Sequence, residues 1–394
     1  MSDPRRTHAT PAATATALTG PAAESTAGNV PTMGVEEEFL LVDAHGPHPA
    51  PHAEAVLAEA DDGRDTTHIE ATRYQVESAT PIAHTAQELR SHLLTLRRRL
   101  AAAATAHGCR LVASATPVVL TSPPASRLVD APRRHEQRAR YGSLTDTLVA
   151  CGCHVHIGTL DLDTAVGVLG HIRPWLPTLI TLGANSPFWE GRDTGHASWR
   201  AVSVSCWPAS GSPPRLDSAE HYHRTLADLV ASGAVMDAKM IYWDARPSAH
   251  WPTVEVRAPD VSTSVDEAVL QAVLVRALVT GALRAVHDGH PAPDIRDGVL
   301  TLARWRAARD GLEGRAVDPH TADLLPANTV VDALIDHVGS DLDDTGDLPH
   351  VERTLARLRR DGCGARRQRR AFERRGLLSD VVDHLAEATV DQNA

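Results

Sequence analysis

Four short segments of the 394-residue chain carry acidic or histidine side chains at every second position. Because successive side chains of a β-strand point to opposite faces, this spacing puts the alternating groups on one face. The pairs that would share a face are Glu36 with Glu38, His154 with His156 and Glu255 with Arg257, and Glu77 ends the remaining segment. Burying many ionisable groups is costly unless something pairs with them, so gathered carboxylates favour a site for metal ions.

The segment from Cys151 to His156 offers a competing zinc interpretation, because it holds four nitrogen and sulfur ligands. Period-two geometry excludes one closed tetrahedral site, since Cys151 and Cys153 would face away from His154 and His156. We expect the cysteines to be small core residues. Two such histidines, taken alone, are more often hydrogen-bonded core residues than ligands.

The acidic run 36–38 leads directly into the apolar residues 39–42, and solvated acidic runs rarely lie inside so apolar a strand. If these carboxylates only paired with arginines, no ligand would be needed to explain them. When Glu77, His154 and Glu255 are considered together with this run, an oxygen-rich site for Mg²⁺ or Mn²⁺ explains the acidic residues better than pairing with arginines.

Composition and charge predict a soluble globular chain without a nucleic-acid or membrane partner. Hydrophobic residues make up 42% of the chain, which is enough for a substantial core. The net charge of -11 argues against non-specific binding to nucleic acids. No apolar run is long enough to span a bilayer. The basic run 353–375 is interleaved with leucines and acidic residues, which favours solvated helices over a nucleic-acid surface.

Arginine supplies nearly all of the positive charge, since Lys239 is the only lysine among 39 Lys and Arg residues. A P-loop needs a Gly-Lys-Ser or Gly-Lys-Thr end, and the sequence has none, so this kind of phosphate site is excluded. Phosphate chemistry would therefore depend on arginine, metal ions and backbone N–H groups.

Residues 1–30 are rich in Ala, Thr and Pro and are expected to form a disordered tail, and residues 31–390 are expected to form a single domain. The tail lacks the uninterrupted apolar stretch of a secretory signal. The five cysteines are an odd number and lack the spacing of a disulfide-bonded framework, which fits a reducing compartment. The expected location is therefore the cytoplasm.

Hydrophobic patterns predict strands over residues 33–42, 69–77, 110–115 and 151–158. Thr85 and Glu88 form a capping box that opens a helix, which Gly108 can close. Ser264 and Glu267 form a second box. Further helices are expected near 136–150 and 163–182 and from 301 onward, and the loop 185–200, with two arginines and two tryptophans, favours a functional role.

Several of these segments, in this order, resemble the glutamine synthetase and glutamate-cysteine ligase superfamily, and more closely the type 2 glutamate-cysteine ligases, or carboxylate-amine ligases. The segments are Gly34-Val35-Glu36-Glu37-Glu38-Phe39, His154-Val155-His156, Asn185 to Gly195, Tyr242 to Ser248, and Val254 to Asp260. The resemblance runs from about Met33 to near Thr389.

The resemblance implies an α+β fold, with a curved antiparallel sheet whose outer face is covered by helices. Its inner face would hold ATP, Mg²⁺ or Mn²⁺, and an amino-acid carboxylate. The metal ligands implied are Glu36, Glu38, Glu70, Glu77, His154 and Glu255. His156 would face the phosphates and Arg257 the substrate, while Arg192 and Arg200 would meet phosphate or the reacting carboxylate.

The activity implied is ATP-dependent amide formation through an acyl phosphate. Glutamate as the acid and cysteine as the amine follow from the resemblance alone. A ligase of the same fold for another acid or amine, a non-catalytic protein that binds a nucleotide or amino acid, and a phosphotransferase that makes no amide are alternatives. The oligomeric state stays open, with a homodimer as one option.

Overall fold

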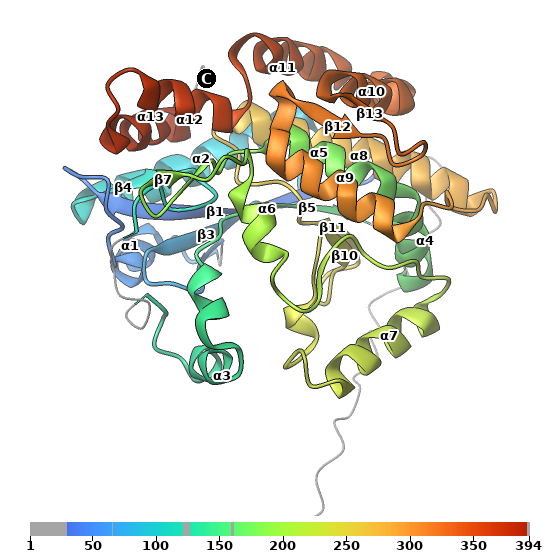
Figure 1. The fold of residues 1–394 in the computed structure, drawn as a ribbon, viewed down its shortest axis with the longest axis horizontal. Helices are drawn as coiled ribbons and strands as arrows, with labels where there is room; N and C mark the ends of the chain where they lie inside the picture. Colours follow the sequence, from blue (N-terminus) through green and yellow to red (C-terminus); the bar gives the residue numbers. More distant parts are fainter. Residues whose placement is uncertain (1–29, 65, 121–126, 159–160, 392–394) are drawn as a thin grey trace, which may run out of the picture.

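The computed structural model describes residues 30–64, 66–120, 127–158 and 161–391. Apart from Val30, the tail expected over residues 1–30 lies outside this part of the chain. A seven-stranded antiparallel sheet lies between helices (Figure 1). Its strands are β1 (Met33–Asp43), β2 (Thr67–Ile69), β3 (Gln75–Ala79), β4 (Cys109–Val112), β5 (Cys153–Gly158), β10 (Ala245–Pro247) and β11 (Thr253–Val256). Their order is β10-β11-β5-β1-β3-β2, and β4 pairs with β1 on the side of β5, beyond the end of that strand.

One face of the sheet is covered by α2 (Ala86–Ala106) and α8 (Val265–His287), as Figure 1 shows. The expected capping box of α2 is confirmed, because the Thr85 hydroxyl accepts the Glu88 N–H at 3.1 Å and Glu88 accepts the Thr85 N–H at 3.3 Å. The predicted apolar stripe of this helix is buried, and it consists of Leu89, Leu93, Leu96 and Leu100.

The second expected capping box is only half formed. Ser264 accepts the Glu267 N–H at 3.4 Å, but the Glu267 carboxylate binds Arg357 and Arg367 instead of the cap. By length and composition α8 could cross a membrane, since its most apolar 18-residue window has a mean hydropathy of 1.7. The expectation that no apolar run is long enough to span a bilayer is therefore wrong. Because 67% of this window is buried inside the protein, its apolar composition is explained by its place as a core helix.

Strand β1 carries different chemistry on its two faces. Glu37 points toward the helices, where Arg97 of α2 donates to both of its oxygens at 2.9 and 2.5 Å. The remaining Arg97 N–H groups donate to the carbonyl oxygens of Ser262, Thr263 and Thr389. This buried ion pair therefore joins β1 to α2 and to α13 (Leu378–Val390).

Strand β5 confirms the alternation behind the exclusion of a Cys/His zinc site for Cys153, which faces away from His154 and His156. Cys153, Val155 and Ile157 are fully buried in the core beneath the helices, while His154 and His156 line a cavity on the other face. Burial raises the pKa of the Cys153 thiol far above its usual value. Cys151, just before the strand, is buried in a neighbouring apolar cluster. The two cysteines are small core residues, as expected.

The strand expected over residues 69–77 is two strands. β2 and β3 form a hairpin whose turn includes a Gln75 N–H bond to the Thr72 carbonyl at 3.2 Å. The helix expected over 136–150 is α3 (Pro132–Tyr141) followed by a 3₁₀ helix (Gly142–Thr147). The helices expected over 163–182 and from 301 onward are present, but the latter region also holds the hairpin of β12 (Arg315–Val317) and β13 (Leu324–Pro326).

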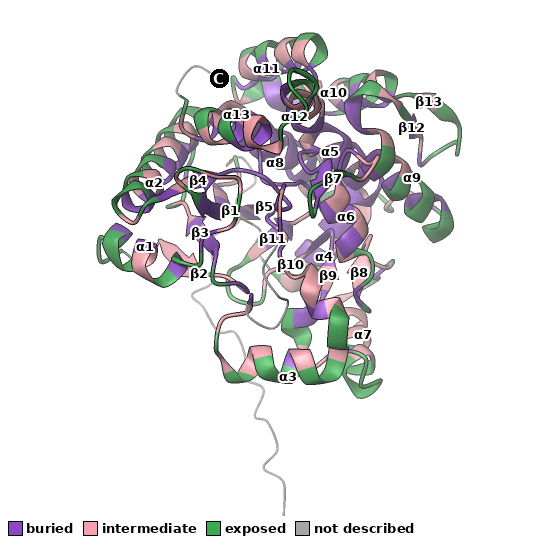
Figure 2. Ribbon diagram, turned by 60° about the vertical axis from the view of Figure 1, so that its left-hand side comes forward, coloured by how far each residue is buried: buried purple, intermediate pink, exposed green. Residues whose placement is uncertain are grey.

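On the side of the sheet opposite α2 and α8, α3 and α7 (Ala219–Ala231) project outward (Figure 1). Figure 2 shows that these two helices are mostly intermediate or exposed, whereas the sheet is buried. The remaining elements are α1 (Ala53–Ala60), α4 (Leu162–Ile172), α5 (Leu176–Gly183), β6 (Phe188–Trp189), β7 (Arg192–Asp193), α6 (Trp199–Val204), β8 (Ser210–Gly211), β9 (Tyr242–Trp243), α9 (Asp297–Asp310), α10 (Ala327–Asp344), α11 (Leu348–Asp361) and α12 (Gly364–Glu373).

Candidate active site

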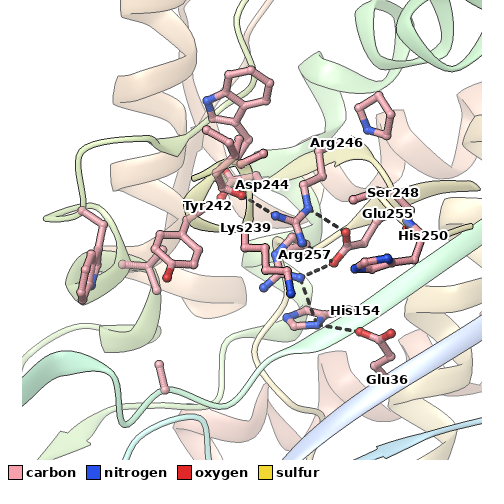
Figure 3. Close-up of a pocket in the computed structure, with 18 of the residues that line it drawn as sticks. Glu36, His154, Lys239, Tyr242, Asp244, Arg246, Ser248, His250, Glu255 and Arg257 are labelled. Carbon is pink, nitrogen blue, oxygen red and sulfur yellow. Dashed lines mark hydrogen bonds and ion pairs between the residues drawn. The ribbon is translucent and has the colours of Figure 1, made fainter. Parts of the chain in front are cut away.

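A cavity of about 670 Å³ opens on the sheet face opposite α2 and α8. Strands β1, β3, β5 and β11 form its floor, and its walls include α3, α6, α7 and the 3₁₀ turn Ala238–Met240. Every residue predicted for the site lines this cavity except Arg192. The residues that do so are Glu36, Glu38, Glu70, Glu77, His154, His156, Arg200, Glu255 and Arg257, and part of the set is drawn in Figure 3.

Strand register explains why these side chains meet. Directly opposite residues of an antiparallel pair have Cβ atoms about 4.5–5.5 Å apart. Four such pairs lie next to one another across the sheet, and they are Glu77 with Glu38, Glu36 with His154, His156 with Glu255, and Glu255 with Arg246. The polar side chains therefore form one continuous row from β3 to β10.

Glu38, Glu70 and Glu77 make up the first group of potential metal ligands, with carboxylate oxygens within 4.8 Å of one another. Burial, and then the charge of Glu70, raise the pKa of Glu38 to about 8. Burial and the neighbouring carboxylates raise the pKa of Glu77 well above its usual value. Glu38 also accepts the Gly152 N–H at 2.6 Å. Arg134 lies 3.8 Å from a Glu70 oxygen, and three close carboxylates that remain this strongly repelled fit a divalent cation.

Glu36, His156 and Glu255 make up the second group, and their ligand atoms also lie within 4.8 Å of one another. His156 Nδ1 is 3.0 Å from the Thr253 hydroxyl, while its buried Nε2 makes no hydrogen bond among the described residues and lies 3.4 Å from a Glu36 oxygen. Such an arrangement leaves Nε2 available to a metal, with the other ring nitrogen held by a second group. This group combines oxygen and nitrogen donors.

His154 lies between the two groups. Its Nδ1 is 3.3 Å from a Glu36 oxygen, and its Nε2 is 3.8 Å from a Glu38 oxygen. Burial, and then the charge of Arg257, lower the pKa of His154 to about 4, so the ring is neutral at pH 7. His154 was the histidine predicted to bind metal and His156 the one predicted to face phosphate. Both histidines contact Glu36, His154 Nδ1 at 3.3 Å and His156 Nε2 at 3.4 Å, and His156 also lies directly opposite Glu255.

Two guanidinium groups hold Glu255. Arg246 Nε is 2.7 Å from one carboxylate oxygen, and Arg257 donates to the other. Burial opposes ionisation of Glu255, but Arg257 and Arg246 outweigh it and keep the pKa of this carboxyl well below its usual value. A cation bound to the second group would therefore share Glu255 with these arginines.

Arg200 reaches the pocket from α6. Ser198 caps this helix by accepting the Ala201 N–H, and the Arg200 guanidinium donates to the carbonyl oxygens of Ala258 and Arg257. Its Nε is buried without a hydrogen bond among the described residues. The side chain lies over Gly152, where an added Cβ would stand 2.4 Å from Arg200 Nη2. Only glycine at position 152 allows the Arg200 guanidinium to keep its position.

Arg192 is not part of the pocket. It is exposed on β7, in a hairpin with β6 that packs against the C-terminal helices. Phe188 lies 5.5 Å from the Phe372 ring, and Asp193 accepts from Arg369 at 2.7 Å. The expected functional loop 185–200 is thus divided, with its hairpin facing α12 and its last arginine facing the pocket.

The pocket also contains residues that the sequence analysis did not assign. Arg246 directly opposes Glu255 on the neighbouring strand. Lys239 and Arg133 lie on the wall, and Asp244 is bound by Arg304 at 2.8 Å. The segment Tyr242 to Ser248 was recognised as resembling the family, and its strand spacing was the available signal for Arg246.

An antiparallel sheet with helices on one face and this row of carboxylates, histidines and arginines on the other defines a glutamine synthetase-like fold. Solved structures agree. A glutamate-cysteine ligase from Francisella tularensis, solved in complex with AMP, matches with a TM-score of 0.70 over 92% of this chain and 89% of that chain, at 12% identity. A bifunctional glutathione synthetase from Pasteurella multocida matches with a TM-score of 0.61 over 91% of this chain and 52% of that chain, at 17% identity. At these identities the likeness shows the fold.

The sequence pattern of Glutamate-cysteine ligase family 2 (GCS2) matches residues 32–384, so the chain belongs to this family of ATP-dependent carboxylate-amine ligases. A protein of Saccharopolyspora erythraea named "Putative glutamate--cysteine ligase 2-1" is 47% identical over 92% of this chain and 96% of its own length. A protein of Salinispora arenicola named "Putative glutamate--cysteine ligase 2" is 46% identical over 91% of this chain and 95% of its own length.

Proposed function

We propose that the protein joins the side-chain carboxylate of glutamate to the amine of cysteine, giving γ-glutamylcysteine. The observation that supports this most is the pair of neighbouring ligand groups on the pocket floor, Glu38 with Glu70 and Glu77, and Glu36 with His156 and Glu255. A ligase that handles a triphosphate and a carboxylate must neutralise several negative charges in one place. Two cation sites beside arginines meet that requirement.

The reaction proceeds in two steps. A carboxylate oxygen of the acid attacks the γ-phosphorus of ATP, so that an O–P bond forms, the bond from Pγ to the bridging oxygen breaks, and ADP leaves. The amine nitrogen then attacks the acyl carbon, so that a C–N bond forms and phosphate leaves with the electron pair of the broken C–O bond. The amine gives up a proton, and the product is an amide.

We assign the two ligand groups to Mg²⁺ or Mn²⁺. Bound there, the ions would supply charge neutralisation and orientation of the phosphates. The protein's contribution is to fix the ligand positions through strand register and to hold Glu255 ionised between Arg246 and Arg257. His154 stays neutral beside the first group and adds no charge that would repel a cation.

Arginines are assigned to the reacting anions. Arg257 and Arg200 line the same cavity, and a guanidinium can bind a carboxylate or a phosphoryl group with two parallel hydrogen bonds. Arg200 Nε has no partner among the described residues, which leaves one donor for a ligand. Arg192 has no such role in this arrangement, because its hairpin lies against the C-terminal helices.

We further propose several properties of the whole protein. They are a single ligase domain over 31–390, a cytoplasmic location, small-molecule substrates without nucleic-acid or membrane partners, and a homodimer. The net charge of -11 and the five cysteines, all free in the structure, support the location and the choice of partners. Light scattering coupled to size exclusion tests the homodimer.

Mass spectrometry of the products tests the substrates. The protein is incubated with ATP, Mg²⁺, glutamate and a mixture of amino acids, and a γ-glutamylcysteine peak that requires ATP is the expected result. A product containing another acid or amine would show that the protein is a ligase whose substrate differs from glutamate or cysteine. Phosphate release without any amide would contradict the proposed reaction.

A further inference from the structure

Lys239, the only lysine of the chain, lies on the wall of the pocket. It belongs to the 3₁₀ turn Ala238–Met240, which follows α7. Figure 3 shows its side chain extending into the pocket, with the ammonium group directed toward Arg257 and His154. The side chains of Lys239 and Arg257 therefore bring two positive charges to the same pocket.

Lys239 differs from the arginines that line the same pocket, because each of those already has a partner. Arg133 binds Asp237, Arg134 binds Gln137, Arg246 and Arg257 bind Glu255, Arg304 binds Asp244, and Arg200 binds carbonyl oxygens. Among the lysine and arginine side chains of the described pocket, Lys239 alone has no hydrogen bond or ion pair. Its ammonium group is free to take an anion.

The backbone around Lys239 is fixed even though the side chain is free. Before the turn, the Asp237 carboxylate accepts the Lys239 N–H at 2.9 Å and is itself held by Arg133 at 2.5 and 3.0 Å. After the turn, the Ile241 carbonyl accepts from Arg246 at 2.7 Å. Met240, inside the turn, is fully buried. Lys239 is thus presented to the pocket from a position anchored on both sides.

We infer that Lys239 is a nucleotide-binding residue, whose ammonium group binds a phosphate oxygen of ATP together with Arg257. Two neighbouring cations directed at one space repel each other, and an anion placed between them removes that cost. Lysine acts on phosphate as a flexible point charge, whereas the planar carboxylate is better matched by the arginine fork. The inference rests on the ATP use of the family and is independent of which acid and amine are joined.

Equilibrium binding of the non-hydrolysable analogue AMP-PNP tests this, measured by calorimetry with Mg²⁺ present. Lys239→Met removes the charge and keeps most of the apolar stem, and the turn survives because Asp237 caps the backbone rather than the side chain. The dissociation constant should rise about tenfold or more, as expected for a lost hydrogen bond between charged groups. Lys239→Arg should restore most of the affinity.

Arg224→Met is the matched control, since Arg224 is exposed on the neighbouring α7, binds Glu220 and does not line the pocket. It should leave AMP-PNP binding unchanged. An unchanged dissociation constant for Lys239→Met would overturn the inference. An effect of Lys239→Met confined to the KM of glutamate would also overturn it, because Lys239 would then bind the substrate carboxylate. Absence of AMP-PNP binding to the wild-type protein would overturn the nucleotide site as a whole, a result distinct from a wrong choice of acid.

Discussion

Glu38 and Glu77 occupy directly opposite positions on β1 and β3, and together with Glu70 they bring their carboxylates within 4.8 Å of one another. Burial and mutual repulsion raise the pKa of Glu38 to about 8 and that of Glu77 well above its usual value. Without an ion the group therefore holds protons. The ability of Glu38, Glu70 and Glu77 to bind a cation can therefore be tested by removing one of the carboxylates.

Glu77→Gln should weaken Mg²⁺ binding by about 10- to 100-fold and reduce turnover accordingly. It should not lower the melting temperature of the metal-free protein, because one carboxylate fewer lessens the repulsion. Titration of activity with Mg²⁺ and thermal unfolding measure the two effects. Glu59→Gln, on the exposed side of α1, is the control. An unchanged Mg²⁺ requirement would remove Glu77 from the ligands.

Mg²⁺ binding should release protons at pH 7. A carboxyl group with a pKa of about 8 is mostly protonated at that pH, and only its ionised form binds the cation. Protons therefore compete with the ion, so Mg²⁺ affinity should rise from about pH 6 to about pH 8 and level off above it. Calorimetry in two buffers with different ionisation enthalpies counts the protons, and identical heats in both would contradict the prediction.

Substitutions of the two histidines of β5 should differ in their effect on metal binding. His156→Gln should weaken Mg²⁺ or Mn²⁺ binding by about 10- to 100-fold, because the His156 ring lies within the second ligand group. His154→Gln should affect turnover more than metal affinity, since the His154 ring lies between the groups. Mn²⁺ binding followed by electron paramagnetic resonance separates the two variants. The opposite order would give the metal role to His154.

Arg97→Met should destabilise the fold by about 3–5 kcal/mol, because it leaves the fully buried Glu37 carboxylate without its cation. Adding Glu37→Gln in the same chain should recover part of that loss, since the uncompensated charge is then gone. Equilibrium denaturation in urea measures both variants. A loss below about 1 kcal/mol for the single change would show that the pair contributes little.

Gly152→Ala should lower turnover while the protein stays folded. The added Cβ would stand 2.4 Å from Arg200 Nη2 and 2.8 Å from His154 Nε2, so the guanidinium must move. Gly339→Ala, at a helical position where the Cβ meets nothing within 4 Å, is the control and should stabilise α10 by roughly 0.5–1 kcal/mol. Full activity of Gly152→Ala would show that Arg200 needs no fixed place.

Local sequence patterns predicted much of the framework. Strand β1 and its division into Glu36 and Glu38 on one face and Val35, Glu37 and Phe39 on the other follow from period-two spacing alone. The start of α2 follows from the Thr85 and Glu88 box, since both partners lie within one helical turn. Strand parity also separated Cys153 from His154 and His156. Each of these features depends on residues close together in the chain.

Tertiary structure decided how distant segments combine. The β2–β3 hairpin, rather than one strand, places Glu70 beside Glu77, and the register between β5 and β11 puts His156 rather than His154 next to Glu255. Packing of the β6–β7 hairpin on α12 removes Arg192 from the pocket, while the turn after α7 brings Lys239 into it. The sequence by itself determined which side chains each strand presents on one face, because a strand's alternation is local. Which of them meet depends on register and packing, which are set by contacts between residues far apart in the chain.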